Sequence, residues 1–401
     1  MKKLMLTTAL AGLMIGGSAI AQTTISGELR IGFKAISVDD EANTSNLTGI
    51  ADSKRGFGIE HQINFANKGK LNVGGLDYAA GFSIENDGVQ TSSLFNENNY
   101  IDLINPSTGT TISFSQDHVQ RSDTDRSAAV IFGYSPNDLS TNGITSAGNR
   151  SASFGVLAGF DNASNTLFDQ TAGPGVGQSQ SIAVLQKLGN FGTVSYNYAP
   201  TLTDKASTTT TGAGSSENLV ETNEKSGYEI GFTGSLGVAG LDVALFKSEQ
   251  KAAVGENTKA KGQHIGVRYS TGPITVGVAQ KKYSDNVRLL STATATTNLT
   301  GFLDDEVETK EKHYGISYAV DKNLSVMLLH ATAKADDSIY LTTAAVSAPL
   351  LRPETQKVTS LQVGYNLGPV ALTAGVAKNT DIGGVADQDQ KMFFTRLIGA
   401  F

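Results

Sequence analysis

Apolar and polar residues alternate with a period of two through most of this chain. In the segment 25–37 the odd positions are apolar or small, namely Ile25, Leu29, Ile31, Phe33 and Ala35. The even positions are mostly polar or charged, namely Ser26, Glu28, Arg30 and Lys34. Successive side chains of a β-strand point to opposite faces, so this pattern predicts a strand that separates an apolar phase from water.

The alternating segments occur in pairs that are joined by very short turns. Residues 182–188 and 193–199, for example, flank a four-residue turn rich in glycine at 189–192. Longer polar stretches separate the pairs, namely 201–226, 286–312, 336–355 and 380–390. Short turns at one end and long loops at the other are typical of outer-membrane β-barrels.

Sixteen segments of the chain fit this pattern. They lie near 23–37, 54–66, 75–86, 96–105, 110–118, 180–188, 191–200, 226–236, 240–249, 261–270, 273–283, 311–320, 323–334, 355–367, 369–379 and 390–401. An even number of strands returns the chain to the side of the membrane where it began. The predicted fold class is therefore all-β, a transmembrane antiparallel β-barrel of 16 strands. Eighteen strands stay possible if the weakly alternating segment 151–160 pairs with another.

The first 21 residues have the organisation of a secretory signal peptide. Lys2 and Lys3 are followed by a mostly apolar run at 4–15, and Ala19 and Ala21 form a small-x-small cleavage site. A basic start, a short apolar run and small residues at the cut are what export through the Sec pathway requires. We expect cleavage after Ala21, which leaves residues 22–401 as one barrel domain.

Charge and composition exclude several other classes of protein. The chain carries 31 Lys and Arg against 38 Asp and Glu, so without Lys2 and Lys3 the formal charge is −9. An acidic balance argues against a nucleic-acid partner, because phosphates select basic surfaces. After residue 21 no uncharged apolar run approaches the roughly 20 residues of a transmembrane helix. The chain has no cysteine, so disulfides and thiolate metal sites are excluded.

The last ten residues, 392–401, end in an alternating apolar segment that terminates at Phe401. This ending resembles the C-terminal strand of Gram-negative outer-membrane proteins, and the resemblance implies that Phe401 is part of the sorting signal read by the barrel-assembly machinery. Together with the export signal, sixteen strands and a long segment after the fifth, residues 22–401 resemble the general, non-specific trimeric porins. The likeness is one of architecture more than of motifs.

The resemblance implies a homotrimer in the outer membrane, in contact with its lipid and lipopolysaccharide. It also implies that the connection 119–179 folds into the lumen and narrows it, with carboxylates facing basic residues of the wall. The corresponding acids here are Asp117, Asp123, Asp125 and Asp138. Arg121 and Arg126 in the same segment depart from that charge pattern.

Five basic residues are expected on the inward face of the barrel. By alternation these pore-wall residues are Arg30, Lys34, Arg268, Lys281 and Arg396. A basic side chain on the lipid face costs roughly 2–4 kcal/mol at mid-membrane, whereas water in a lumen solvates it. The first and last strands must be neighbours in a closed barrel, so Arg30 and Arg396 should lie close together. Such charges can act as a filter for solutes.

The function predicted from these features is passive diffusion of small hydrophilic solutes and ions through a water-filled porin. Two alternatives stay open: a substrate-selective channel, and a non-transport barrel that serves as an adhesin, receptor or enzyme. The sequence has neither a His-x-x-x-His pair nor a Gly-x-Ser-x-Gly elbow, so no catalytic residue, metal site or cofactor is predicted.

Overall fold

The computed structural model describes residues 22–38, 54–86, 95–116, 180–200, 226–251, 259–285, 307–335, 354–384, 386–387 and 389–401. Their strands are β1 (Gln22–Val38), β2 (Lys54–Lys70), β3 (Asp77–Asn86), β4 (Phe95–Asn105), β5 (Thr110–Gln116), β6 (Gln180–Lys187), β7 (Thr193–Ala199), β8 (Gly227–Gly234), β9 (Leu241–Lys251), β10 (Lys259–Thr271), β11 (Ile274–Asp285), β12 (Val307–Ala319), β13 (Leu324–Ala335), β14 (Gln356–Asn366), β15 (Val370–Thr380) and β16 (Gln390–Ala400). A short 3-10 helix, η2 (Ile382–Gly384), precedes the last strand.

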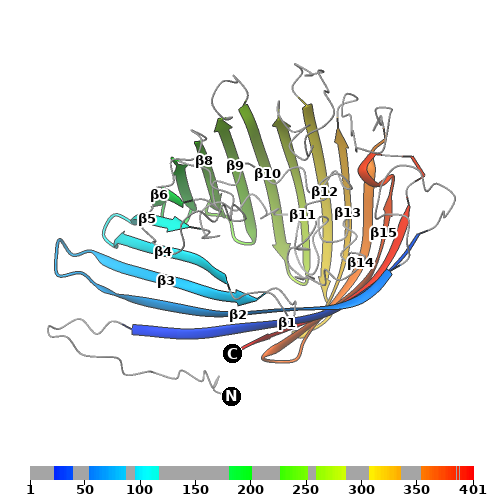
Figure 1. The fold of residues 1–401 in the computed structure, drawn as a ribbon, viewed down its shortest axis with the longest axis horizontal. Helices are drawn as coiled ribbons and strands as arrows, with labels where there is room; N and C mark the ends of the chain where they lie inside the picture. Colours follow the sequence, from blue (N-terminus) through cyan, green and yellow to red (C-terminus); the bar gives the residue numbers. More distant parts are fainter. Residues whose placement is uncertain are drawn as a thin grey trace, which may run out of the picture.

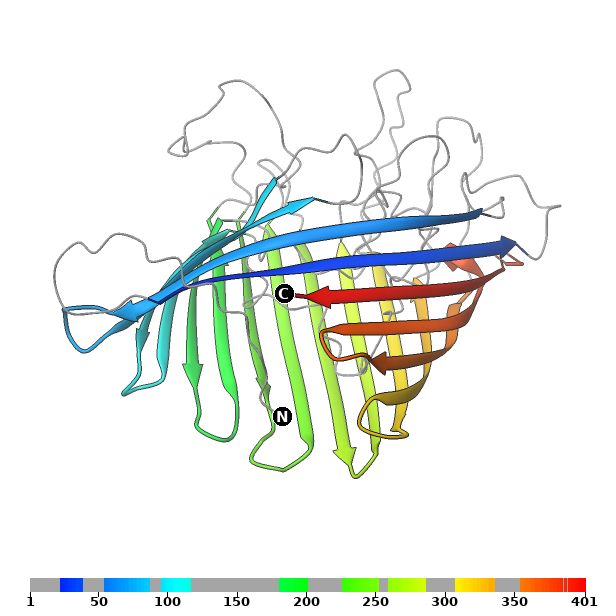
Figure 2. The same cartoon turned by 90° about the horizontal axis from the view of Figure 1, so that it is seen from below.

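The sixteen strands of the described residues close into one antiparallel barrel. Each strand pairs with its neighbours in the chain, and β1 pairs with β16. Figure 2 shows β1 and β16 side by side, and Figure 1 shows β1 and β2 running steeply across the direction of β9–β13 on the other wall, as tilted barrel strands do. The predicted fold class is confirmed. Because β5 pairs directly with β6, the barrel closes with sixteen strands, and segment 151–160 lies outside the described residues.

Burial alternates along the strands with the predicted phase. On β1, Leu29 and Ile31 are exposed, whereas Lys34 and Ile36 are buried. In a closed barrel the protected side chains point inward and the exposed ones point outward. Large aliphatic and aromatic side chains are exposed on the other strands as well, as with Leu361 on β14, which is 49% exposed. The outer surface of the barrel is therefore an apolar band.

Two strands extend four residues beyond the bounds that the alternation predicts. Strand β2 continues to Lys70 instead of ending near residue 66, and β12 begins at Val307 instead of near residue 311. Both extensions, 67–70 and 307–310, are largely polar on both faces. Backbone pairing continues past the end of the apolar band, where water solvates both faces, so the hydropathy pattern gives no signal there.

Specific backbone geometry forms the short turns. Gly192, in the turn before β7, has φ +148°, and a Cβ added there would overlap the carbonyl oxygen of Thr233. In the turn before β13, the backbone N–H groups of Asn323 and Leu324 donate to Oδ1 of Asp321 at 2.7 and 2.9 Å. These hydrogen bonds hold the pKa of Asp321 below its ordinary value of 3.8, because they stabilise the ionised carboxylate.

The seam between the first and last strands ends in a reciprocal pair of backbone hydrogen bonds. The N–H of Gly27 donates to the carbonyl of Phe401 at 2.8 Å, and the N–H of Phe401 donates back at 3.0 Å. The Phe401 ring occupies the space that a side chain at position 27 would fill. The terminal residue is thus part of the barrel closure.

Among the described residues, no helix is long and apolar enough to cross a membrane. The predicted signal peptide, residues 1–21, lies outside the described residues, as do the connection 119–179 and the carboxylates Asp117, Asp123, Asp125 and Asp138. Their predicted roles stay predictions.

Candidate functional site

The inward face of the barrel carries ionisable side chains that are almost fully protected. Lys34, Glu229, Lys281, Glu311 and His313 are each at most 4% exposed. They come from β1, β8, β11 and β12, so they are spread around the wall. Buried charges need partners, and the strand register shows how several of them are placed.

Three of the predicted basic residues lie together at the seam of the barrel. On β16, Arg396 is the direct cross-strand partner of Gly32 on β1, so Arg30 and Lys34 flank it two residues away on either side. All three lie on the inward face, since they share the phase of the buried Phe394. Nε of Arg30 also donates to the Glu28 carboxylate. Arg30 and Arg396 therefore lie close together in the strand register, as expected from the sequence.

The other two predicted basic residues, Arg268 and Lys281, each face an acid from a neighbouring strand. Nη2 of Arg268 on β10 donates to Oδ2 of Asp242 on β9 at 2.5 Å. Lys281 on β11 is the direct cross-strand partner of Glu311 on β12. Both basic residues lie on the inward face, but their charge is partly compensated within the wall.

A row of ionisable side chains crosses β10, β11 and β12 at Lys281. His264 is the cross-strand partner of Lys281 on one side, and Glu311 is its partner on the other. Nε2 of His313 lies 2.8 Å from Oε2 of Glu311. Lys281 was predicted from the sequence, whereas Glu311 and His313 were not. The turn at 272–273 fixes the pairing of Lys281 with His264, whereas a long connection separates Glu311 from both.

Acidic side chains occupy other walls of the barrel. Glu85 on β3 and Asp102 on β4 are each 8% exposed and point inward, and the Ser113 hydroxyl donates to Asp102. Glu229 lies on β8. In a closed barrel of sixteen strands, β8 stands across from β16, so Glu229 and the basic seam with Arg396 belong to opposite walls. Charges of opposite sign on opposite walls produce a field across the lumen.

One sector of the inward face is apolar, which the sequence analysis did not anticipate. It consists of buried side chains on β1 and β13–β16, chiefly Ile36, Met327, Leu329, Val358, Met392 and Phe394. Phe394 is the cross-strand partner of Lys34, so the apolar sector borders the basic seam. The sequence does contain a signal for this apolar sector. Residues 392–394 are all apolar, so apolar side chains occupy both faces of β16 there.

Among the residues that the structure describes, no group of three or more His, Asp or Glu side chains lies close enough together to hold an ion. The charged side chains of the inward face form the candidate site, with Arg30, Lys34 and Arg396 on its basic side.

Comparison with known proteins agrees with this architecture. Residues 7–337 match the model of a family described as Gram-negative porin, whereas no curated protein sequence matches the chain significantly. The fold is similar to the anion-selective porin of Comamonas acidovorans, with TM-score 0.58, 14% identity, and coverage of 95% of this chain and 100% of that one.

Two further solved structures share the fold. For the trimer form of OmpT from Vibrio cholerae, the TM-score is 0.54 at 11% identity, covering 95% of this chain and 99% of that one. For OmpF of Salmonella typhi in complex with daunomycin, it is 0.53 at 13% identity, covering 95% and 98%. At these sequence identities the similarity shows a shared fold alone.

Proposed function

The chain belongs to the Gram-negative porin family, and we propose that the lumen lined by Arg30, Lys34 and Arg396 is its solute path. Small hydrophilic solutes and ions diffuse passively through this outer-membrane barrel. The observation that carries the proposal is the division of the wall: large apolar side chains are exposed outside, and ionisable side chains such as Lys34, Glu229 and Glu311 are buried inside. A closed barrel satisfies every backbone group without water, so its apolar face can meet lipid while its inner face encloses a channel.

The charges of the inner wall tune which solutes pass. Arg30, Lys34 and Arg396 form a basic patch at the seam, and Glu229 stands on the opposite wall. A transverse field of this kind orients dipolar solutes and retards apolar ones. Further carboxylates at Asp117, Asp123, Asp125 and Asp138 would strengthen it if their connection folds into the lumen, as the family resemblance implies. Arg268 and Lys281, which face Asp242 and Glu311, contribute less net charge, as does Arg30 beside Glu28.

The assembled form is proposed to be a homotrimer. The support is that the trimer form of Vibrio cholerae OmpT shares the fold of this chain. Residues 1–21 would direct export through the Sec pathway, and the barrel-assembly machinery would recognise the strand that ends at Phe401. In the outer membrane the apolar band then contacts lipid and lipopolysaccharide. No catalytic role is assigned to any residue.

Single-channel recording in planar bilayers tests the proposed function. The full-length mature protein should give large conductance steps with a linear current–voltage relation. Saturable block by one sugar or anion would instead indicate a substrate-selective channel. Lack of conductance by correctly folded trimers would refute the porin function and favour an adhesin, receptor or enzyme.

A further inference from the structure

A row of polar side chains crosses the inward face of β7, β8 and β9, and we call it the polar row. It consists of Asn197, Glu229 and Ser248, which are successive cross-strand partners in the strand register. Each of these three residues is 1% exposed. Neighbouring strands lie about 4.8 Å apart, so the polar row is about 10 Å long. It contains the acid that stands across the lumen from the basic seam.

Two members of the polar row have polar atoms without hydrogen-bond partners. Among the residues that the structure describes, neither Nδ2 nor Oδ1 of Asn197 makes a hydrogen bond, and Oγ of Ser248 makes none either. Buried polar groups almost always have a partner, because an unsatisfied group has given up its water without replacement. The amide and the hydroxyl can therefore gain hydrogen bonds from a ligand in the lumen.

Short side chains surround the polar row on the same face of the barrel. Along β8, Glu229 lies between Gly227 and Gly231. The next cross-strand partners at the two ends of the row are Ala183 on β6 and Gly262 on β10. A glycine inside a strand often marks a place where a ligand approaches the backbone closely. Because no long side chain stands beside Glu229 along its own strand, a solute can approach its carboxylate.

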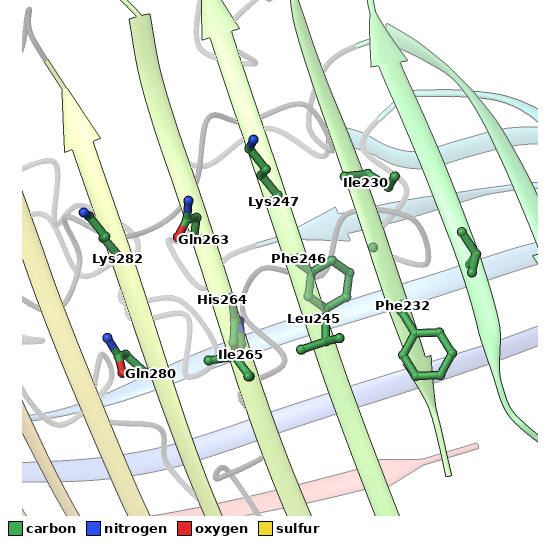
Figure 3. A pocket seen from close by; sticks show the side chains of 12 residues that line it. Ile230, Phe232, Leu245, Phe246, Lys247, Gln263, His264, Ile265, Gln280 and Lys282 are labelled. Atoms are coloured by element: carbon green, nitrogen blue, oxygen red, sulfur yellow. The ribbon is translucent and has the colours of Figure 1, made fainter. Parts of the chain in front are cut away.

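An aromatic ring borders the polar row on the side of the short turns. Phe246 lies two residues before Ser248 on β9, points inward and is 8% exposed. Its ring covers Gly231, since a Cβ added to that glycine would lie 2.5 Å from Cδ1 of Phe246. Figure 3 shows this ring between β9 and β8. The polar row therefore has an apolar surface along one edge.

The chemistry of the polar row selects among classes of ligand. The Asn197 amide offers a donor and an acceptor, the Ser248 hydroxyl can do either, and the Glu229 carboxylate accepts. An anionic ligand only accepts hydrogen bonds and is repelled by Glu229. An ammonium group only donates, so it leaves Nδ2 of Asn197 without an acceptor. A hydroxyl group both donates and accepts, and two neighbouring hydroxyls can therefore satisfy the amide and the carboxylate together.

We propose that the polar row binds a neutral polyhydroxylated solute, namely a sugar, on its way through the lumen. The hydroxyls of the sugar bond to Asn197, Glu229 and Ser248, and the C–H face of its ring packs against Phe246. The inference rests on the proposed function, because the sugar reaches the row through an open lumen. Binding at one wall leaves the opposite side of the lumen open, so it retains the sugar for a time without replacing passive diffusion.

The test uses sucrose as the probe and measures its dissociation constant by saturation-transfer NMR with the folded full-length mature protein in detergent micelles. Ser248→Ala should weaken sucrose binding roughly two- to tenfold, the contribution of one neutral hydrogen bond. Glu229→Gln keeps the shape and removes the charge, so binding should weaken about tenfold. Asn197→Asp keeps Oδ1 and loses the Nδ2 donor, so it should also weaken binding. The matched control is Ser317→Ala, which removes a hydroxyl that is 2% exposed on the inward face of β12 and should leave sucrose binding unchanged.

Several outcomes would overturn the proposal. An equal loss in Ser317→Ala and Ser248→Ala would mean that the polar row is not a specific site. Equal binding of triethylene glycol, which lacks neighbouring hydroxyls, would show that these groups are not recognised. Tighter binding of putrescine than of sucrose would assign the row to a cation. Absence of sucrose binding by a protein that conducts KCl normally would mean that the row holds water only. The KCl conductance of every variant is recorded in parallel, so that failure of the sugar site is distinguished from failure of the pore.

Discussion

Replacing Val278 with lysine tests whether the outward face of the barrel lies in hydrocarbon. Val278 is on β11, points outward and is 52% exposed. It lies four residues after Ile274, so a strand tilted by about 45° places it about 9 Å above the short turns, well inside an apolar band about 25 Å tall. A lysine at that depth should cost roughly 2–4 kcal/mol.

Ile274 provides the matched position on the same strand and the same face. It is the first residue of β11, beside the short turn, and it is exposed on the outside. A lysine at this position lies at the edge of the apolar band, so Ile274→Lys should cost no more than about 1 kcal/mol. The cost at Val278 corresponds to a roughly 30- to 700-fold drop in the folding equilibrium constant, at about 1.4 kcal/mol per factor of ten.

Reversible folding into phosphatidylcholine vesicles from denaturant measures both costs. The chain has no Trp, so the folded fraction is followed by circular dichroism and by the mobility of unheated samples in gels. Val278→Leu controls for the loss of valine itself. If Val278→Lys folds as stably as Val278→Leu, or if Ile274→Lys loses as much as Val278→Lys, the outward face does not cross hydrocarbon at this depth and the reasoning is wrong.

The remaining predictions address the lumen, the turns and the seam. Arg396→Gln should shift permeability towards cations several-fold at low salt, and an unchanged reversal potential in a KCl gradient would contradict this. Gly192→Ala should lower barrel stability well beyond the cost of backbone strain alone. Gly189→Ala, at φ +58° but with open space around it, should lose only that strain of about 1 kcal/mol and serves as the control in thermal unfolding. The lowered pKa of Asp321 means that its stabilisation is complete above pH 3.8 and is lost as the pH falls through the folded-state pKa; Asp321→Asn should remove this step from a stability profile between pH 2 and 5. Deletion of Phe401 should reduce the amount of barrel in outer-membrane fractions, and normal amounts would show that the seam closes without it.

The face of each strand was predictable from the sequence because the energetic penalty is large and local. Arg30, Lys34 and Arg396 alternate with apolar neighbours, and only one assignment keeps their charge out of lipid. The number of strands was predictable because short turns and polar loops separate the alternating segments. Where both faces are polar, as at 67–70 and 307–310, no such penalty exists, so the end of β2 was placed too early and the start of β12 too late.

The ion pairs within the wall were not predictable in the same way. A short turn fixes the register of the two strands that it joins, and Lys281 and His264 are related in this manner. Arg268 and Asp242 lie on strands that a longer connection separates, as do Lys281 and Glu311. A one-residue slip would exchange the faces of a strand, but a slip by two residues keeps the faces and changes every partner. Alternation alone therefore cannot choose these pairs.

Lys281 and Lys282 show how one rule about charge produces two surfaces. Consecutive residues of a strand must point to opposite faces, so one of these lysines faces outward whatever the register. Lys281 points inward, 4% exposed, opposite Glu311. Lys282 points outward and pairs with Glu308, and its depth near the loop end makes this orientation inexpensive. A charged residue on a strand is therefore evidence for the lumen near mid-membrane. Near the loop end of a strand the same residue type can face outward at little cost.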